Sequence, residues 1–167
     1  MAPTLITTRD LVELQLADTT NLTWSAAALD AAIKSALGDI ASAYETEYTL
    51  EGLDGALTST FNLYDFSLII DGAIAYALST RAAQRFEQAT PEGIAPALVQ
   101  LAQFRMDRFQ LSLTQIRISR YEAAAAQAER DHIAALKTAE DARIADLQAS
   151  ATAPHSQWEW EEGEDFT

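Results

Sequence analysis

The stretch that decides the fold is residues 97–153, ALVQLAQFRMDRFQLSLTQIRISRYEAAAAQAERDHIAALKTAEDARIADLQASATA, which contains neither Gly nor Pro over 57 residues. As a single helix at roughly 1.5 Å per residue, it would be about 85 Å long. A compact domain of this size has a radius of gyration of only about 15 Å. The residues before it cannot cover such a rod, so it must bend back, extend into solvent or lie against other chains. This indicates a component of an assembly.

The rest of the sequence also has a helical character. Of its 167 residues, 49% are hydrophobic, only six are Gly and four are Pro, and the apolar residues recur at helical spacings. The chain has no cysteine, so disulfides and Cys-based zinc or redox chemistry are ruled out. We predict an all-α protein: a small helical bundle with a long C-terminal helix and an extended acidic tail.

Four helices are expected along the chain. Thr7 or Thr8 is predicted to cap a first helix that ends near Leu16, and Thr23 or Ser25 to cap a second. A loop follows at residues 45–60, with a brief extended piece at 48–50, and a third helix runs from residues 62–65 to about 87. Residues 88–96 form a turn, and Pro96 lies in the first turn of the fourth helix. The second helix has the clearest apolar stripe, formed by Leu29, Ile33, Leu37, Ile40 and Tyr44.

The long Gly- and Pro-free run changes character near Tyr121. Before it, bulky apolar residues predict a place in the core or an interface, whereas after it the sequence is Ala-rich and charged. The second part keeps a narrow apolar seam with an eleven-residue spacing, made by Ile133, Leu136, Ile144 and Leu147. The expected organisation is therefore a bundle core at 1–120, a projecting helical arm at 121–153 and an extended acidic, aromatic tail at 154–167.

The charge of the chain excludes several functions. The net charge is −14, and residues 1–90 carry 12 acidic and 4 basic side chains. Phosphate binding depends on clustered Lys and Arg, so adhesion to nucleic acid or anionic lipid is not expected. No window reaches the roughly 18 apolar residues of a membrane span, and the N-terminus lacks the pattern of a signal peptide, so we expect a protein that is soluble where it is made.

Catalytic chemistry is not expected. The two histidines, His132 and His155, stand in no HxxxH or HxxE arrangement, and no GxGxxG, GxxxxGK[ST] or GxSxG pattern occurs. Glu140, Asp141 and Asp146 alternate with Lys137 and Arg143 at helical spacing, which is typical of a solvated, salt-bridged face. We therefore predict no enzyme, no metal and no cofactor.

Two groups of charges are candidates for structural contacts. Asp71 lies in the most apolar helix, where it is expected to face a loop or to pair with Arg81 or Arg85. A second group brings two Arg pairs onto the long helix, and its members can pair with the acidic first half of the chain or with a neighbouring subunit. We predict intersubunit contacts for Arg105, Arg108, Arg117 and Arg120.

The tail, PHSQWEWEEGEDFT at residues 154–167, is too short and too polar to fold alone. Tryptophan is a frequent interface anchor, and acidic disordered segments commonly become ordered on a partner. The alternative is a frayed terminus whose tryptophans fold back on the protein. We favour a docking arm whose contact residues are Trp158, Glu159, Trp160, Glu161, Glu162 and Phe166.

Two stretches together resemble a known family. TWSAAALDAAIKSALGDIASAY (23–44) is similar to the segment near the N-terminus of head–tail connector (adaptor) proteins of tailed bacteriophages and gene transfer agents, and NLYDFSLIIDGAIAYALSTRAAQRF (62–86) to their next core helix. The resemblance covers residues 8–120 and carries no catalytic residue. It implies a helical bundle that forms a ring, typically of twelve copies, beneath the portal, with C-terminal segments that reach the portal protein.

The expected function is therefore a structural head–tail adaptor at the virion neck, made in the cytoplasm of the bacterial host. Its expected partners are the portal protein, neighbouring copies of itself, and a downstream neck, stopper or tail protein. DNA would pass through the ring without specific binding, because a negative lumen repels phosphates. Two alternatives stay open: an acidic DNA mimic that inhibits a DNA-binding enzyme, and an assembly scaffold or chaperone.

Overall fold

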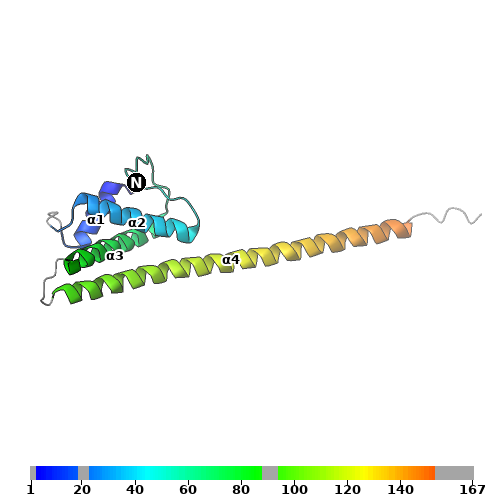
Figure 1. Cartoon of the computed structure of the whole chain (residues 1–167). Helices are drawn as coiled ribbons and strands as arrows, with labels where there is room; N and C mark the ends of the chain where they lie inside the picture. Colours follow the sequence, from blue (N-terminus) through cyan, green and yellow to red (C-terminus); the bar gives the residue numbers. More distant parts are fainter. Residues whose placement is uncertain (1–2, 19–22, 88–93, 153–167) are drawn as a thin grey trace, which may run out of the picture. The chain divides into compact units, whose positions relative to one another are not determined.

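The computed structural model describes residues 3–18, 23–87 and 94–152, and these are all-α (Figure 1). The helices are α1 (Leu5–Gln15), α2 (Ala26–Tyr44), α3 (Leu63–Glu87) and α4 (Ile94–Thr152). The chain divides into two compact units, Met1–Tyr121 and Glu122–Thr167. Helix α4 contributes to both, so residues 97–152 lie in one helix rather than two.

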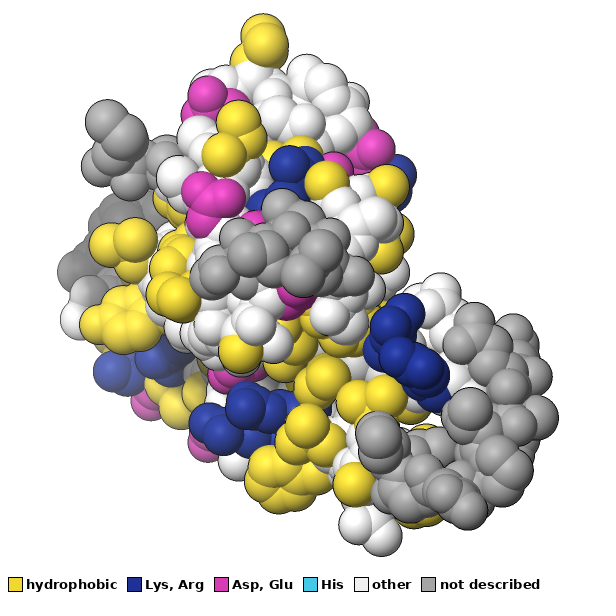
Figure 2. Space-filling model, turned by 90° about the vertical axis from the view of Figure 1, so that its left-hand side faces the viewer, with side chains coloured by type: hydrophobic (Ala, Val, Ile, Leu, Met, Phe, Trp, Pro, Cys, Tyr) yellow, Lys and Arg dark blue, Asp and Glu magenta, His cyan; other side chains and the backbone are white. Residues whose placement is uncertain are grey.

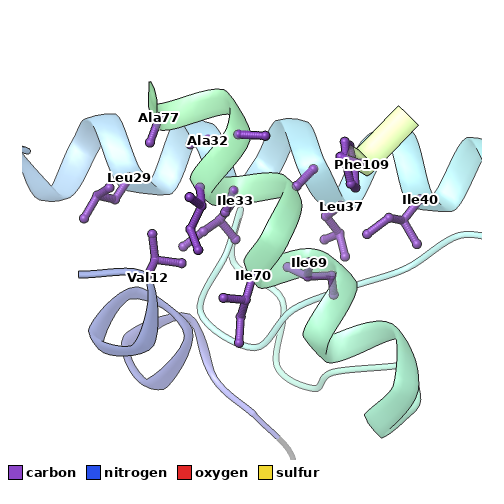
Figure 3. Close-up of a cluster of buried hydrophobic side chains, with 14 of the residues drawn as sticks. Val12, Leu29, Ala32, Ile33, Leu37, Ile40, Ile69, Ile70, Ala77 and Phe109 are labelled. Carbon is purple, nitrogen blue, oxygen red and sulfur yellow. The ribbon is translucent and has the colours of Figure 1, made fainter. Parts of the chain in front are cut away.

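The core of the first unit is built around α2 and α3. The predicted stripe of α2 is buried at Leu29, Ile33, Leu37 and Ile40, and Tyr44 is half-buried. Helix α3 contributes Ile69, Ile70 and a run of small residues, and α1 adds Val12 (Figure 3). Small and branched side chains allow close helix packing. The apolar first half of α3 is therefore covered on several sides.

Three caps fix where the first three helices begin. Ser25 accepts a hydrogen bond from the backbone N–H of Ala28, which confirms one of the two predicted caps of α2. The side chain of Asn62 accepts from the backbone N–H groups of Tyr64 and Asp65 at the start of α3. Helix α1 begins earlier than expected. Its cap is Thr4, which forms a capping box with Thr7, so the prediction of Thr7 or Thr8 as the cap was wrong.

The loop between α2 and α3 is tied to the start of the chain. The backbone carbonyl of Glu51 accepts a hydrogen bond from the backbone N–H of Leu5 (2.8 Å), and the hydroxyl of Ser59 donates to the carbonyl of Pro3 (2.6 Å). Leu50 and Leu53 of this loop are buried in the same core. The loop is thus part of the packed structure, although its sequence predicts only a loop with a brief extended piece at 48–50.

Gly72 of α3 lies where three helices meet. A Cβ atom at this position would be 2.6 Å from the Phe109 ring of α4 and 2.8 Å from the Cβ of Ala36 of α2. Only glycine allows this approach. Phe109 and Leu113 are each 1% exposed, so the first half of α4 completes the core of the unit.

Candidate functional site

Hydrogen-bonded acids and tyrosines lie between the helices of the first unit. The buried carboxylate of Asp65 accepts hydrogen bonds from the hydroxyls of Tyr44 (2.8 Å) and Tyr48 (3.0 Å). Tyr76 donates in the same way to Asp39, and its ring meets Phe109 edge-on. Burial, and then the hydrogen bond to Asp65, raises the pKa of Tyr44 and of Tyr48 to about 12. The bond to Asp39 raises that of Tyr76 to about 12. These hydroxyls stay protonated and serve as structural donors.

Other acids of the first unit pair with bases of the same unit. Arg9 forms a bidentate salt bridge with Asp30, and Lys34 pairs with Asp54. Asp71 is partly exposed and forms no salt bridge with the residues that the structure describes. The guanidinium of Arg81 instead lies 6.0 Å from the ring centre of Trp24. The expected pairing of Asp71 with Arg81 or Arg85 is therefore not found among the described residues.

The four arginines of α4 have different roles. Arg120 donates to the backbone carbonyl of Ala43 (3.0 Å) and to the carboxylate of Glu45 (2.9 Å), and so binds the carbonyl end of α2. A cation at a helix C-terminus satisfies free carbonyls and the helix dipole. Arg120 therefore pairs with the acidic first half of its own chain, which was one of the two arrangements expected for these arginines. Arg105, Arg108 and Arg117 form no salt bridge in the described part of the chain, and their contacts with neighbouring copies stay a prediction.

The side of α4 that faces away from the core carries large apolar side chains. Ala102, Phe109 and Leu113 are buried, whereas a second group of large apolar residues in the same segment is exposed. These residues are between 45% and 71% exposed. Helical geometry places Phe104, Leu111 and Ile118 opposite the buried residues, and Leu101 and Tyr121 on the two flanks. The bulky composition of this segment predicts a core or an interface. In the structure, one side of the helix is buried in the core and the other side is exposed.

A shallow groove lies between α3 and the first half of α4. Its volume is about 500 Å³. Small residues of α3 form one wall and longer residues of α4 the other, so the lining is mostly apolar: Ser79, Ala82, Ala83, Val99, Ala102, Gln103, Met106 and Asp107. The sequence alone does not predict this groove, because the groove depends on how two helices lie together. On the face drawn in Figure 2, hydrophobic side chains are exposed between charged ones.

The second unit has a simpler surface. Every side chain from residue 122 to residue 150 is exposed, including the predicted seam residues Ile133, Leu136, Ile144 and Leu147. Gln127 bridges Arg130 and Asp131 by hydrogen bonds. The charged face is solvated as predicted. None of the five charges expected to alternate there forms a salt bridge within the described residues.

The remaining predicted contact residues lie outside the described part of the chain. They are the tail residues Trp158, Glu159, Trp160, Glu161, Glu162 and Phe166. In the described ranges, no cluster of three or more His, Cys, Asp or Glu residues is placed to hold a metal ion. None of the described helices is long and apolar enough to cross a membrane.

Comparisons of the chain with protein-family models, with curated proteins and with solved structures found no match.

Proposed function

We propose that this protein is a structural head–tail adaptor of a tailed phage, which forms a ring under the portal around the DNA channel. The ring would link the portal to the next neck or tail component. One observation carries the proposal. Helix α4 contributes Phe109 and Leu113 to the core of the first unit and continues as a helix exposed at every side chain from 121 to 150. A long exposed helix of this kind can serve as a contact surface for other protein chains.

The distribution of charge supports a channel component. Residues 1–90 carry 12 acidic side chains against four basic ones. Two of those bases, Arg9 and Lys34, are already paired with acids, and Arg81 lies against Trp24. The net charge of residues 1–90 is therefore negative, and a negative surface repels the phosphates of passing DNA.

The same contacts disfavour the DNA-mimic alternative. A mimic needs a row of free carboxylates at phosphate-like positions, but Asp30, Asp54 and Glu45 are in salt bridges. Asp39 and Asp65 accept hydrogen bonds from tyrosine hydroxyls. Five acids of the first unit are thus used for internal contacts.

The lateral contacts of the ring are assigned to Arg105, Arg108 and Arg117, which have no acidic partner among the described residues of the same chain. A cyclic ring is built from head-to-tail contacts between two different surfaces of each subunit. Arginines on α4 and acids on the neighbouring copy would form such a pair. The tail, with Trp158, Trp160 and Phe166, is proposed as the segment that binds the portal.

The proposal is tested by mixing the protein with the portal protein of the same genome and imaging the product by electron microscopy. We expect a ring of copies on one face of the portal. A variant that ends at Ala153 should keep its helical circular dichroism but lose recruitment to portal-containing heads. Recruitment of this variant at the normal level would contradict the role of the tail. Absence of any ring with the complete chain would contradict the adaptor function.

A further inference from the structure

The two flanks of α4 differ at the level of the groove. Val99, Gln103 and Asp107 line the groove at a spacing of four residues. Leu101 and Arg105 lie midway between them in the sequence. At 3.6 residues per turn, residues two apart lie about 160° from each other around a helix. One flank of α4 therefore borders a groove, and the opposite flank carries Leu101 and Arg105 at the same level.

Two different surfaces on opposite flanks are suited to a head-to-tail contact. In a cyclic ring, each subunit uses one surface toward the next copy and another surface toward the previous copy. We propose that Leu101 of one copy enters the groove between α3 and α4 of the next copy around the ring. This inference rests on the ring of the proposed function, and it identifies the two surfaces through which the copies meet.

The levels of the two surfaces select a second copy as the occupant of the groove. Copies in a cyclic ring are related by rotation about the ring axis, without a shift along it. With α4 along this axis, a residue meets only residues at its own level in the next copy. Leu101 lies between Val99 and Gln103 in sequence, and so falls within the span of the groove. The contact therefore needs no shift between copies, as a ring requires.

Charge complementarity supports the same contact. Asp107 at the groove and Arg108 are both exposed, and neither forms a salt bridge with the residues that the structure describes. Adjacent residues of one helix do not face each other, so the two charges of one chain are poorly placed to pair. Arg108 follows Leu101 by seven residues and shares its flank. Across the contact, Arg108 of one copy lies within one residue of the level of Asp107 of the next, where its guanidinium can bind the carboxylate.

The groove also suits the side chains of the opposite flank in size and polarity. Its volume is about 500 Å³, and Ala82, Ala83 and Met106 contribute to its apolar lining. Leu101 is 45% exposed, and the stem of Arg105 can cover apolar surface while its charged end stays in water. In protein interfaces, a few side chains that fill pockets carry most of the binding energy. Leu101 is the side chain expected to do so here.

Disulfide cross-linking of the complete chain, with and without the portal protein, tests the contact, since the natural chain has no cysteine. Leu101→Cys and Gln103→Cys chains should give a mixed dimer when combined under mild oxidation, and little product alone. A chain with both substitutions should give a ladder of larger species, because its two cysteines lie on opposite sides of one helix. Leu101→Cys dimers as abundant as the mixed product, or no mixed product under either condition, would overturn the proposal.

An exchange of charges in the chain with both cysteines tests the ion pair. Arg108→Asp and Asp107→Arg each place like charges across the contact, and each should reduce the yield of the ladder by at least about tenfold. The variant with both exchanges should restore the yield, because the pair is complementary again. This variant has the same net charge as the natural chain and so controls for charge. A yield that stays low in it would overturn the pairing of these two residues.

The contact and the adaptor function fail in different ways. A ring on the portal in electron microscopy, without the mixed dimer, would overturn the contact and leave the adaptor function. A cross-linked ladder from a protein that never binds the portal would support the contact and contradict the adaptor function.

Discussion

Two parts of helix α4 reach the same backbone conformation by different means. In the first unit, Phe109 and Leu113 are buried against α3 and the helix gains stability from tertiary packing. From residue 122 to residue 150 every side chain is exposed, and 11 of these 29 residues are Ala, the strongest helix former. Tertiary packing thus stabilises the first part of the helix, and the high helix propensity of alanine stabilises the second. A change at equivalent positions should therefore have very different effects in the two parts.

The largest difference is expected between two leucines of the same helix. Leu113→Ala removes a side chain that is 1% exposed and leaves a cavity, which should lower the free energy of unfolding by about 2–5 kcal/mol. Leu136→Ala makes the same chemical change at a residue that is 57% exposed, and should change it by no more than about 0.5 kcal/mol. Urea denaturation followed by circular dichroism measures both. Equal losses would show that Leu136 is also packed in solution.

Substitutions at two glycines test how closely the helices of the first unit are packed. Gly72→Ala forces the Phe109 ring or Ala36 to move and should cost about 1–3 kcal/mol. Gly38→Ala is the matched control in α2, because a Cβ atom there has nothing within 4 Å. The control should stabilise the protein by about 0.5–1 kcal/mol through helix propensity. A neutral Gly72→Ala would mean that α3 and α4 are packed less closely than the structure has them.

The three half-buried tyrosines predict how the first unit responds to alkali. Folding raises the pKa of Tyr44, Tyr48 and Tyr76 from 10.0 to about 12, so their contribution is complete below pH 10 and is lost as the pH rises toward 12. Absorbance at the tyrosinate wavelength should titrate in this range. Asp65→Asn should lower the pKa of Tyr44 and Tyr48 part of the way, because burial remains, and Asp39→Asn should act on Tyr76 alone. If either variant altered all three, the two sites would be coupled.

The smallest effect is expected at Arg120. Arg120→Ala removes the contacts with Ala43 and Glu45 at the end of α2, but the groups are partly exposed, so the loss should be about 1 kcal/mol or less. Arg117→Ala, three residues earlier, has no described ion pair to lose and should be neutral. The melting temperatures of the two variants test this difference: that of Arg120→Ala should be the lower one. Identical values would remove Arg120 from the list of bundle contacts.

Periodicity was enough to predict most of the fold. The apolar stripe of α2 was visible because Leu29, Ile33, Leu37 and Ile40 recur at helical spacing, and local signals placed the starts of α2 and α3. The start of α1 was missed, since Thr4 and Thr7 compete with Thr8 as equally good caps until the chain is seen to turn at Thr4. The extent of α4 as one helix was left open, because nothing in an Ala-rich sequence distinguishes a continuous helix from two.

For the candidate contact surfaces, the sequence predicted the residue types but not which residues are exposed. The sequence identified the large apolar residues of the segment before Tyr121 but did not separate Phe109, which is buried, from Phe104, which is exposed. That separation depends on which side α3 covers. The pairing of Arg120 with the end of α2 joins residues 75 or more positions apart, and only the packing of the helices brings them together.

The contact of Arg120 also has a mechanical meaning. Among the described residues, Arg120 is the last side chain of α4 with a hydrogen bond to one that lies outside the helix, and it lies directly before the border at Tyr121. A partner that pulls on residues 122–150 along the helix axis therefore loads this contact first. The force then passes to the end of α2 and to Phe109 and Leu113, whose side chains are buried in the core and resist sliding. The order of these contacts along α4 would set the sequence in which the bundle yields to tension.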